Sequence, residues 1–569
     1  MRIETLTIAG FRGIDTTIEF APTLALVAGA NNSGKTSIID AIRSLLQPFA
    51  EGLGNRWISA SDFTRVKNGN PIEDLEISAV FADIPAKHQG RLISILAPSL
   101  GSGYGRLTLR SRMNQDGRPL TRWSGGDLGL NDVESIARDS IRFIYMPALR
   151  DASADLRPGP SNKLANLVSA HAPIGHADRK KLVDIMTAAN IDLAAVDAII
   201  TTATSIQARL SGMTGAGPYA HTSELQFTEA RFERIIASLQ SLAGSSPSTS
   251  RLSENGLGYN NLLYVSVLLA LLETDSAIPL NVLLVEEPES HLHPQLQSLL
   301  LKYLQSLTDA TTQVIATTHS PQFASAAEVK RLTVLRRAAH PASTTAHFLA
   351  NAPLSARSSN HLRRFLDLTK STMLFSDSVI LVEGIAELIL FPALALTRGI
   401  SLAETGITVV SVDGLAFDPF ISVFENGGIP LRCAVVSDSD PTPSELDENG
   451  SDQFALPSAT ATKLKGRDGG NIRVVLATRT FEWDLAYVNF EKPSVLIDAL
   501  EAIRPRVADR LRAAKFADAS EFADGLLDAV SKVKGPFAQA LADSIEESEA
   551  QIVVPAYVMD AINFAGDLE

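Results

Sequence analysis

The feature that most constrains the fold is a glycine-rich loop near the start of the chain. Residues 29–36 read Gly-Ala-Asn-Asn-Ser-Gly-Lys-Thr and fit the pattern G-x-x-x-x-G-K-[ST]. An apolar run at residues 24–28 precedes the loop, and a stretch of helical spacing follows it. A strand, this loop and a helix in that order are typical of a P-loop, so we expect an α/β fold. The alternative, an ordinary glycine turn, does not explain the flanking strand and helix.

The residue types in this loop suit a bound phosphate chain. The glycines let backbone N–H groups curl around phosphate oxygens, Lys35 reaches the outer two phosphates, and the Thr36 hydroxyl binds magnesium at the start of the helix. We therefore predict that the loop binds ATP. The residues assigned to the nucleotide are Gly29, Asn32, Ser33, Gly34, Lys35, Thr36 and Ser37.

Two later strand ends carry groups that ATP hydrolysis needs. Residues 281–285 are apolar and lead into Glu286 and Glu287. One carboxylate at such a position holds magnesium and the next activates water, so we assign Glu286 to the metal and Glu287 to the base. Residues 314–318 lead in the same way into His319. A lone histidine after a strand is more often structural, but its place downstream of the acidic pair favours contact with the γ-phosphate.

A second β/α series begins near residue 378 and carries a different group of acids. Residues 378–382 are apolar and end in Glu383, and Glu387 falls on the first turn of the helix expected next. Another apolar run ends in Asp438 and Asp440, which point the same way if the segment is extended. Taken singly, each pair could be a turn or a polar loop. Together, four convergent carboxylates predict a site for Mg²⁺ or Mn²⁺ rather than zinc.

The nucleotide motifs resemble the ABC-type ATPase heads of the SMC/Rad50 class and of the OLD (overcoming lysogenization defect) nucleases. By that resemblance, the segment 253–261, with Ser253 and Gly256, is the signature loop that contacts nucleotide on a second subunit. A dimer is therefore implied. The motif Phe-Arg-Gly at 11–13 would place Arg12 near the phosphates. We find no clear Q-loop glutamine, which leaves open how the nucleotide state reaches the second domain.

The acidic motifs resemble the Toprim fold that topoisomerases, primases and OLD nucleases share. Two later segments extend the resemblance to OLD nucleases: one supplies Glu482 as a further metal-site acid, and the other supplies Lys534 as a cation for the transition state. Both residues could equally form surface ion pairs. The arrangement implies two-metal hydrolysis of a phosphodiester without a covalent enzyme intermediate. No tyrosine lies in a segment typical of topoisomerase strand breakage.

Size and pattern breaks indicate several domains in the 569 residues. We expect an ATPase part at 1–160, a helical insertion that forms a dimer interface at 161–250, the return of the ATPase at 251–350, a linker at 351–375 and a Toprim domain at 376–569. The fold class is therefore α/β, an ABC-type P-loop ATPase with a helical insertion followed by a Toprim domain.

Composition sets further bounds. A net charge of −14 excludes a protein that coats nucleic acid through bulk charge, although a nuclease can have a locally basic groove. A basic run could line a DNA-facing helix or form a solvated face: Arg504, Arg506, Arg510, Arg512 and Lys515. The single cysteine, Cys433, excludes an internal disulfide and suggests a buried strand position. Without an evident signal peptide or membrane span, we expect the cytoplasm.

These observations favour an ATP-dependent DNA endonuclease of the OLD family. The resemblance implies a homodimer or higher oligomer, DNA as substrate, and a role in anti-phage defence or DNA processing. Within the family, the Gabija-type nuclease subunit is the first expectation, and such proteins work with a helicase encoded alongside. Other OLD proteins act alone or with a reverse transcriptase, and the sequence does not choose among these subgroups. The alternative is an SMC/Rad50-like DNA-sensing ATPase whose Toprim domain is not catalytic.

Overall fold

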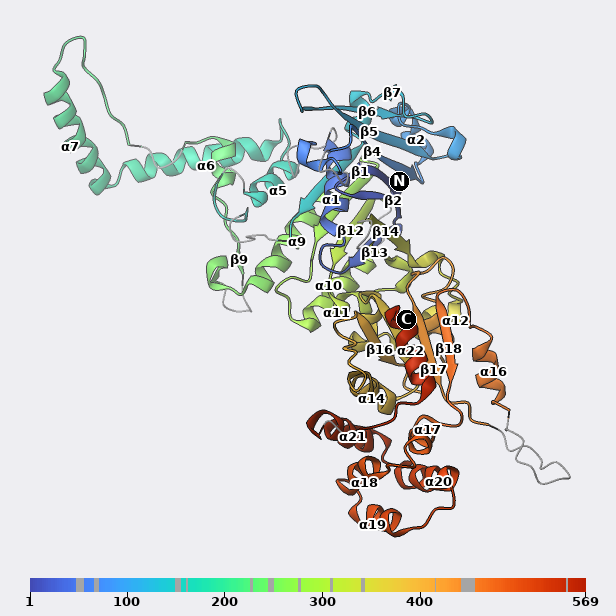
Figure 1. Ribbon diagram of the computed structural model, residues 1–569. Coiled ribbons are helices and arrows are strands. Elements are labelled where there is room, and N and C mark those ends of the chain that lie inside the picture. The colour runs from blue at the N-terminus through green and yellow to red at the C-terminus, as the bar shows by residue number, and fades with distance from the viewer. Residues whose placement is uncertain are drawn as a thin grey trace.

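The computed structural model describes residues 1–47, 56–65, 71–148, 155–159, 162–225, 229–243, 250–274, 278–307, 311–338, 343–414, 416–441, 456–548 and 551–568. Two α/β parts follow one another along the chain, and a helical arm projects from the first (Figure 1). The fold class predicted from the sequence is confirmed.

The first part is built on a twelve-stranded sheet with a parallel centre. Its central strands lie side by side in the order β8, β11, β12, β3 and β13, and every neighbouring pair among them is parallel. Strands β3 and β11 are buried along their whole length, as expected for parallel strands covered on both faces. The central strands are β3 (Leu24–Gly29), β8 (Ile141–Met146), β11 (Leu280–Glu286), β12 (Thr312–Thr318) and β13 (Leu332–Ala338).

A wing of mostly antiparallel strands extends the sheet, with β2 and β14 paired in parallel, and strands such as β4 place a buried residue at every second position. They are β1 (Arg2–Phe11), β2 (Ile14–Glu19), β4 (Asp74–Ala82), β5 (Gly105–Met113), β6 (Pro119–Gly125), β7 (Asn131–Asp132) and β14 (Ser343–Phe348). The helices of this part are α1 (Lys35–Leu45), α2 (Ala86–Gln89), α3 (Ser135–Arg138), α9 (Leu257–Glu273), α10 (Pro294–Ser306) and α11 (Pro321–Ser325).

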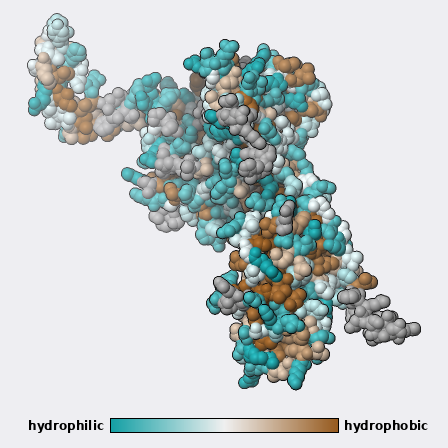
Figure 2. All heavy atoms as spheres, in the orientation of Figure 1, coloured by the Kyte–Doolittle hydropathy of each residue, from teal (hydrophilic) through white to brown (hydrophobic). Residues whose placement is uncertain are grey.

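The helical arm is formed by the segment expected as an insertion. It contains α5 (Lys163–His171), α6 (Ala177–Ala194), α7 (Asp197–Thr214) and α8 (Phe232–Ala237), with the short strands β9 (Leu242–Ala243) and β10 (Ser250–Arg251) at its base. No residue of α6 or α7 is buried. Apolar side chains on these helices, such as Ile185 and Ile191, are more than half exposed, and Figure 2 shows brown side chains along the arm. Helices α6 and α7 therefore do not pack against the core of the first part, whereas Leu164 and Leu167 of α5 do.

The second part has a four-stranded parallel sheet in the order β16, β15, β17, β18. The strands are β15 (Ser378–Val382), β16 (Ile407–Ser411), β17 (Cys433–Ser437) and β18 (Ile472–Leu476). Its helices are α14 (Ile385–Leu396), α15 (Asp418–Ile421), α16 (Ala459–Lys465), α17 (Phe481–Val488), α18 (Ser494–Glu501), α19 (Pro505–Ala513), α20 (Ala519–Val530), α21 (Lys534–Ser548) and α22 (Ala556–Gly566). Cys433 is buried at the start of β17, as predicted.

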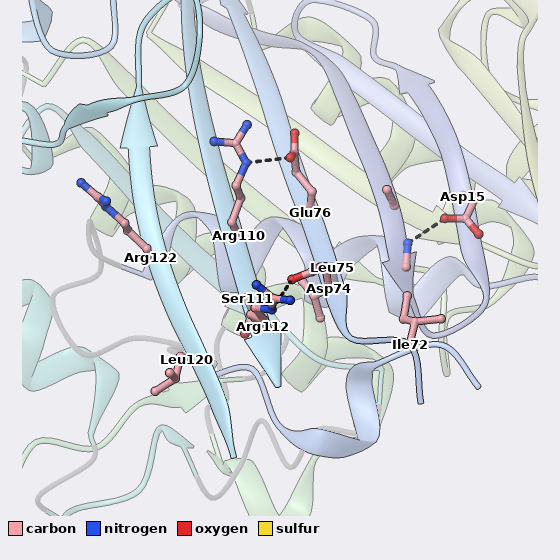
Figure 3. Close-up of a pocket in the computed structure, with 12 residues that line it drawn as sticks. Asp15, Ile72, Asp74, Leu75, Glu76, Arg110, Ser111, Arg112, Leu120 and Arg122 are labelled. Atoms are coloured by element: carbon pink, nitrogen blue, oxygen red, sulfur yellow. Dashed lines mark hydrogen bonds and ion pairs between the residues drawn. The ribbon is translucent and has the colours of Figure 1, made fainter. Parts of the chain in front are cut away.

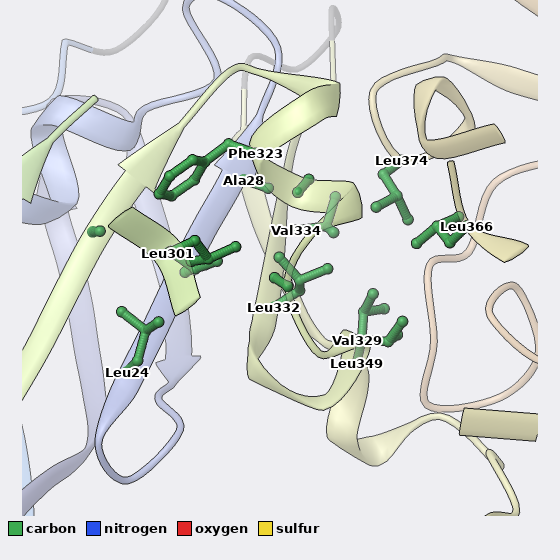
Figure 4. Close-up of a cluster of buried hydrophobic side chains, with 14 of the residues drawn as sticks. Leu24, Ala28, Leu301, Phe323, Val329, Leu332, Val334, Leu349, Leu366 and Leu374 are labelled. Atoms are coloured by element: carbon green, nitrogen blue, oxygen red, sulfur yellow. The ribbon is translucent and has the colours of Figure 1, made fainter. Parts of the chain in front are cut away.

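Residues 351–375, expected as a linker, contain α12 (Ala356–Phe365) and α13 (Leu368–Ser371). One hydrophobic cluster runs from the ATPase sheet through this segment into the Toprim sheet. Figure 4 shows the crossing: Phe323 of α11 on one side, and Leu366 and Leu374 of the linking segment on the other. A shared core of this kind restricts relative motion of the two parts.

Among the helices in the described ranges, none combines the length and apolarity needed to cross a membrane.

Candidate active sites

The P-loop lies at the carboxyl end of β3, where α1 begins at Lys35. Gly34 has a φ of 100°, which only glycine adopts without strain, and no side chain caps the helix. The first N–H groups of α1 are therefore left to the loop and to a ligand. This is the geometry that binds a phosphate chain.

Hydrogen bonds fix the positions of the polar and charged side chains around the loop. The Lys35 ammonium donates to the carbonyl oxygens of Gly29 and Ala30, both at 2.8 Å. The Thr36 hydroxyl donates to Glu286 Oε2 at 2.6 Å, and the Tyr145 hydroxyl donates to Glu286 Oε1 at 2.7 Å. A lysine, a hydroxyl and a strand-end carboxylate in this arrangement fit a magnesium nucleotide.

The predicted base and the predicted γ-phosphate contact touch each other. His319 Nδ1 lies 2.8 Å from Glu287 Oε1, and Glu287 has a left-handed φ of 47°. A non-glycine residue in that region is a feature of functional sites. Glu289, beside them, is buried and bonds to the Thr318 hydroxyl, and burial raises its pKa. The structure therefore brings Glu286, Glu287 and His319 to one sheet edge.

Three predicted nucleotide residues have other surroundings. The Arg12 guanidinium is held by Asp40 at 2.9 Å and by Asp62 at 2.8 Å, so its observed partners are carboxylates. Ser253 lies in a short 3-10 helix, and its side chain is outside the described residues. Gly256 precedes α9, where Leu257 and Tyr259 are 59% and 65% exposed. The trans contact of this loop stays a prediction.

The second group of acids gathers at the carboxyl ends of β15 and β17. Glu383 follows β15, Glu387 lies in the first turn of α14, and Asp438 follows β17. The Asp438 backbone N–H lies 3.4 Å from Glu383 Oε2, and the Phe481 N–H donates to Asp438 Oδ1 at 2.9 Å. A pocket of about 260 Å³ opens beside Glu383, Asp438 and Asp440.

The predicted extended geometry of residues 438–440 is wrong. Asp440 has a left-handed φ of 40°, so the chain turns there. The turn is held by the Arg479 carbonyl oxygen, which accepts from the Ser439 and Asp440 N–H groups at 3.1 and 3.4 Å. Asp440 still lines the pocket, although by a turn instead of by strand alternation.

Glu482 and Lys534 join this group instead of lying on a solvated face. Glu482, in the first turn of α17, is 2% exposed, and Lys534 Nζ lies 2.8 Å from its Oε2. Burial, followed by the charges of Glu383, Glu387 and Glu482, raises the pKa of Asp438 to about 8. Burial also raises the pKa of Glu387 to about 7. Such shifts mean that carboxylates crowd together in a poorly solvated place.

This donor set fits a hard divalent cation. Glu383, Glu387, Asp438, Asp440 and Glu482 all offer carboxylate oxygens, and oxygen ligands are those that Mg²⁺ and Mn²⁺ prefer. Within the described ranges, no three acidic, histidine or cysteine side chains already surround one common point. The carboxylates would therefore have to draw closer around an ion.

Two further polar groups near the acids were not predicted. The Tyr557 hydroxyl, from the first turn of α22, is buried and has no hydrogen-bond partner among the described residues. Burial raises its pKa, and Asp484 is the charge that adds most to this shift. Asp484 Oδ1 is also buried, and the part of the chain that the structure describes offers it no partner. Sequence spacing gives no signal for Tyr557, because it lies far along the chain from the acidic motifs.

The raised pKa values predict that added metal stabilises the protein more at pH 8 than at pH 6. In the metal-free folded state Asp438 keeps its proton up to about pH 8. An aspartate in the unfolded chain loses its proton at about pH 4. The folded state therefore binds more protons across this window, and its stability falls as pH rises. Melting temperatures with chelator should drop from pH 6 to pH 8, and Mn²⁺ should reverse the drop.

Asp438→Asn is the matched control for this titration because it removes the ionisable group and keeps the shape. Its metal-free melting temperature should depend less on pH than that of the parent. Equal pH slopes for the two proteins would contradict the assignment of the raised pKa to Asp438.

A larger hollow of about 660 Å³ lies on the antiparallel wing, away from both sites (Figure 3). Its three arginines are each paired with a carboxylate: Arg110 with Glu76, Arg112 with Asp74, and Arg122 with Asp132. Because the charges in the lining are matched, this face has little excess positive charge to attract phosphate.

Two family models match the chain in the regions that carry these sites. The model for an AAA ATPase domain, AAA_15, matches residues 1–94 and 246–324. The model for the Toprim domain of proteins like the overcoming lysogenization defect protein matches residues 374–440. The first region includes the P-loop, Glu286 and His319, and the second includes Glu383 and Asp438.

The chain is also similar to proteins of known sequence. The Escherichia coli (strain K12) protein named "Uncharacterized protein YbjD" is 23% identical over 77% of this chain and 80% of its own length. The chromosome partition protein Smc of Mycobacterium tuberculosis is 25% identical over 25% of this chain. That match covers 11% of the Smc sequence, so it concerns a small part of a much longer protein.

Three solved structures are similar to the chain over part of its length. An Smc head bound to the C-terminal winged-helix domain of ScpA aligns over 62% of this chain and all of its own, with 16% identity and a TM-score of 0.39. The C-terminal region of the Burkholderia pseudomallei OLD protein aligns over 34% of this chain and 98% of its own, with 26% identity and a TM-score of 0.25. The corresponding region from Xanthomonas campestris pv. campestris aligns over 34% of this chain and 95% of its own, with 29% identity and a TM-score of 0.25.

The fold and the matched regions define an ABC-type P-loop ATPase joined to a C-terminal Toprim domain. The chain therefore joins an AAA ATPase domain to a Toprim domain similar to that of the overcoming lysogenization defect protein.

Proposed function

We propose that this protein is an ATP-hydrolysing, metal-dependent DNA endonuclease that cleaves phosphodiesters at the Toprim acids. The observation that supports it most directly is the group of converging carboxylates, of which Glu387 and Glu482 are buried, with Lys534 beside them. Glu387 and Asp438 have pKa values raised to about 7 and about 8, a cost that a divalent cation would offset. A structural domain has no need for such crowding.

The Toprim residues divide into metal ligands and a cation for the phosphate. Glu383, Glu387 and Asp438 would hold Mg²⁺ or Mn²⁺, with Asp440 at the edge of the pocket. Bound ions of this type make a water nucleophilic and stabilise the departing 3′ oxygen. Lys534, kept charged because its pKa is raised by the hydrogen bond to Glu482 despite burial, would stabilise the negative charge that develops on the phosphate.

We assign to the ATPase residues the roles predicted from their motifs. Lys35 would contact the phosphates, and Thr36 and Glu286 would hold the magnesium of the nucleotide. Glu287 would accept a proton from the attacking water. Its contact with His319 supports a role for the histidine in orienting it.

Incubation of the purified protein with supercoiled plasmid tests the proposal. Mg²⁺ or Mn²⁺ should produce nicked or linear DNA, and chelator should prevent it. The reactions are run with and without ATP, so that any nucleotide effect is seen in the same assay. Absence of cleavage under every condition would favour the other candidate, an SMC/Rad50-like ATPase with a non-catalytic Toprim domain.

The basic run at 504–515 gives limited support for a DNA-facing helix. Arg512 lies between Asp498 at 2.9 Å and Glu501 at 2.5 Å, so its charge is already matched. Arg506 and Arg510 remain as candidates on the same helix, α19. The alternative, a solvated face, fits Arg512 better.

We further propose a homodimer or higher oligomer. An ABC-type nucleotide site takes its signature loop from a second subunit, and the exposed Leu257 and Tyr259 beside Gly256 support an interface there. The uncovered apolar side chains of α6 and α7 support a second contact through the arm.

Light scattering should give at least twice the mass of one chain for the parent. A version that lacks residues 163–242 should give a lower mass while its melting transition and ATP binding persist. A monomeric parent would contradict the oligomer, and an unchanged mass for the folded deletion would contradict the arm interface.

A role in anti-phage defence or DNA processing follows from the OLD-like pairing of domains. A helicase encoded alongside is an expectation of the Gabija-type resemblance alone.

A further inference from the structure

The loop that carries His319 is joined to a short helix that reaches the Toprim part. Ser320 caps α11: its hydroxyl oxygen accepts from the Phe323 N–H at 3.2 Å. Phe323 is fully buried in the cluster shared by the two parts. A displacement of His319 would therefore be passed to α11 instead of being absorbed by a free loop.

Helix α11 is bonded in turn to α13. The Ser371 hydroxyl lies 2.9 Å from the Pro321 carbonyl oxygen and, at the same distance, from that of Leu368. Ser371 is completely buried. Only one residue, Ser320, separates Pro321 from His319, so α13 is directly connected to the nucleotide-site loop.

Lys370, the neighbour of Ser371, bridges α13 and the Toprim sheet. Its side chain is 8% exposed, and its Nζ lies 2.9 Å from Asp367 Oδ2 and 2.7 Å from Asp413 Oδ2. Although burial acts to lower it, the hydrogen bonds to the two aspartates raise the pKa of Lys370. A charged lysine buried to this extent requires both carboxylates.

Asp413 begins a turn that is attached to the metal-site strand. Asp413 and Gly414 both have left-handed backbones, with φ of 55° and 68°. The Gly414 N–H donates to the carbonyl oxygen of Glu383 at 2.8 Å, and the Val412 N–H donates to that of Val382 at 2.9 Å. A strained aspartate persists only when its surroundings hold it, and here Lys370 is one of the groups that hold it.

We propose that Lys370 is a positioning residue that couples the nucleotide site to the nuclease site, by fixing the Asp413–Gly414 turn against the backbone of Glu383. The proposal rests on the proposed function, because it concerns regulation of the same Toprim acids. In ABC-type ATPases a Q-loop glutamine is expected to link the nucleotide site to the second domain, and the sequence has no clear one. Lys370 would provide that link here. Loss of the Lys370 ammonium should leave ATP binding intact, but the Asp413–Gly414 turn should no longer respond to bound ATP.

Hydrogen exchange on the full-length protein tests this without any need for DNA cleavage. The background is Glu287→Gln, compared with and without ATP at constant Mg²⁺. The amides of Val412 and Gly414 should change their exchange rate about fivefold or more when ATP binds, the size of a modest allosteric coupling. Lys370→Met in the same background should lose this change while the P-loop amides still respond to ATP.

Two variants separate a positioning role from a general loss of structure. Lys370→Arg keeps the charge and should restore part of the response. Lys492→Met makes the same substitution at an exposed lysine that bonds to Gln551, and should respond like the background protein. Melting temperatures identify any variant that fails to fold. Asp413→Asn removes the charge of the other partner in the Lys370–Asp413 ion pair and should also lose the response.

The outcomes are distinct. If the Val412 and Gly414 amides ignore ATP in the background protein, or if Lys370→Met responds as fully as the background, the coupling role of Lys370 is wrong. Plasmid cleavage decides the proposed function separately, since the exchange response does not depend on it.

Discussion

Replacement of Asp438 by alanine is expected to reduce metal-dependent DNA cleavage by about a thousandfold or more. Asp438 lies between Glu383 and the start of α17 and is the acid whose pKa is raised furthest in the site, to about 8. Ion ligation of this kind contributes several kcal/mol of transition-state stabilisation, and each interval of about 1.4 kcal/mol is tenfold in rate. Rates of plasmid nicking at saturating Mn²⁺ measure the effect.

The same variant should fold normally. Above about pH 8, where Asp438 loses its proton, its removal relieves repulsion among the crowded carboxylates, so the metal-free melting temperature at that pH should not fall. Asp560→Ala is a suitable control because Asp560 pairs with Arg473 on an exposed face of α22 and should keep full cleavage. Cleavage by Asp438→Ala at the parental rate would show that the Toprim acids are not the reacting site.

The second large effect is expected in the ATPase, where two substitutions should separate binding from hydrolysis. Lys35→Ala removes the ammonium that faces the loop carbonyls and should abolish detectable ATP binding. Glu287→Gln keeps the shape of the side chain and the contact with His319, but it cannot accept a proton. Its turnover should fall by about 10²–10⁴, the usual contribution of a general base, with binding retained.

Nucleotide affinity by calorimetry and phosphate release measure the two steps separately. Normal turnover in Glu287→Gln would move the base role to another group, for which the buried Glu289 is the nearest candidate. Tight ATP binding by Lys35→Ala would contradict the P-loop assignment.

The sequence predicted the strand ends well because each is a local pattern. An apolar run that stops at an acid or a histidine identifies the position without knowledge of the fold, as for Glu286, His319 and Glu383. Each of the two parallel sheets then brings its own strand ends together at one edge. Asp440 shows where the approach fails: alternation along a strand was assumed, and the chain turns at that residue.

Local sequence patterns do not predict contacts between segments that lie far apart in the chain. Tyr145 bonds to Glu286, and nothing in its local sequence marks it. Lys370 becomes notable only when α13 and the turn after β16 lie together. The resemblance to OLD nucleases pointed to Glu482 and Lys534 as site residues, but a surface ion pair was equally consistent with the sequence. The burial of Glu482 favours the site over the surface ion pair.

The most direct measurement of the central claim is the chemistry of the cut DNA ends. Supercoiled plasmid is incubated with the protein and Mn²⁺, the protein is then denatured, and the DNA is examined for attached protein and for ends that ligase can rejoin. Hydrolysis at the Toprim acids predicts free DNA with 5′-phosphate and 3′-hydroxyl ends, in amounts that fall with Asp438→Ala. DNA covalently bound to the protein, or cleavage that persists in chelator, would contradict the account.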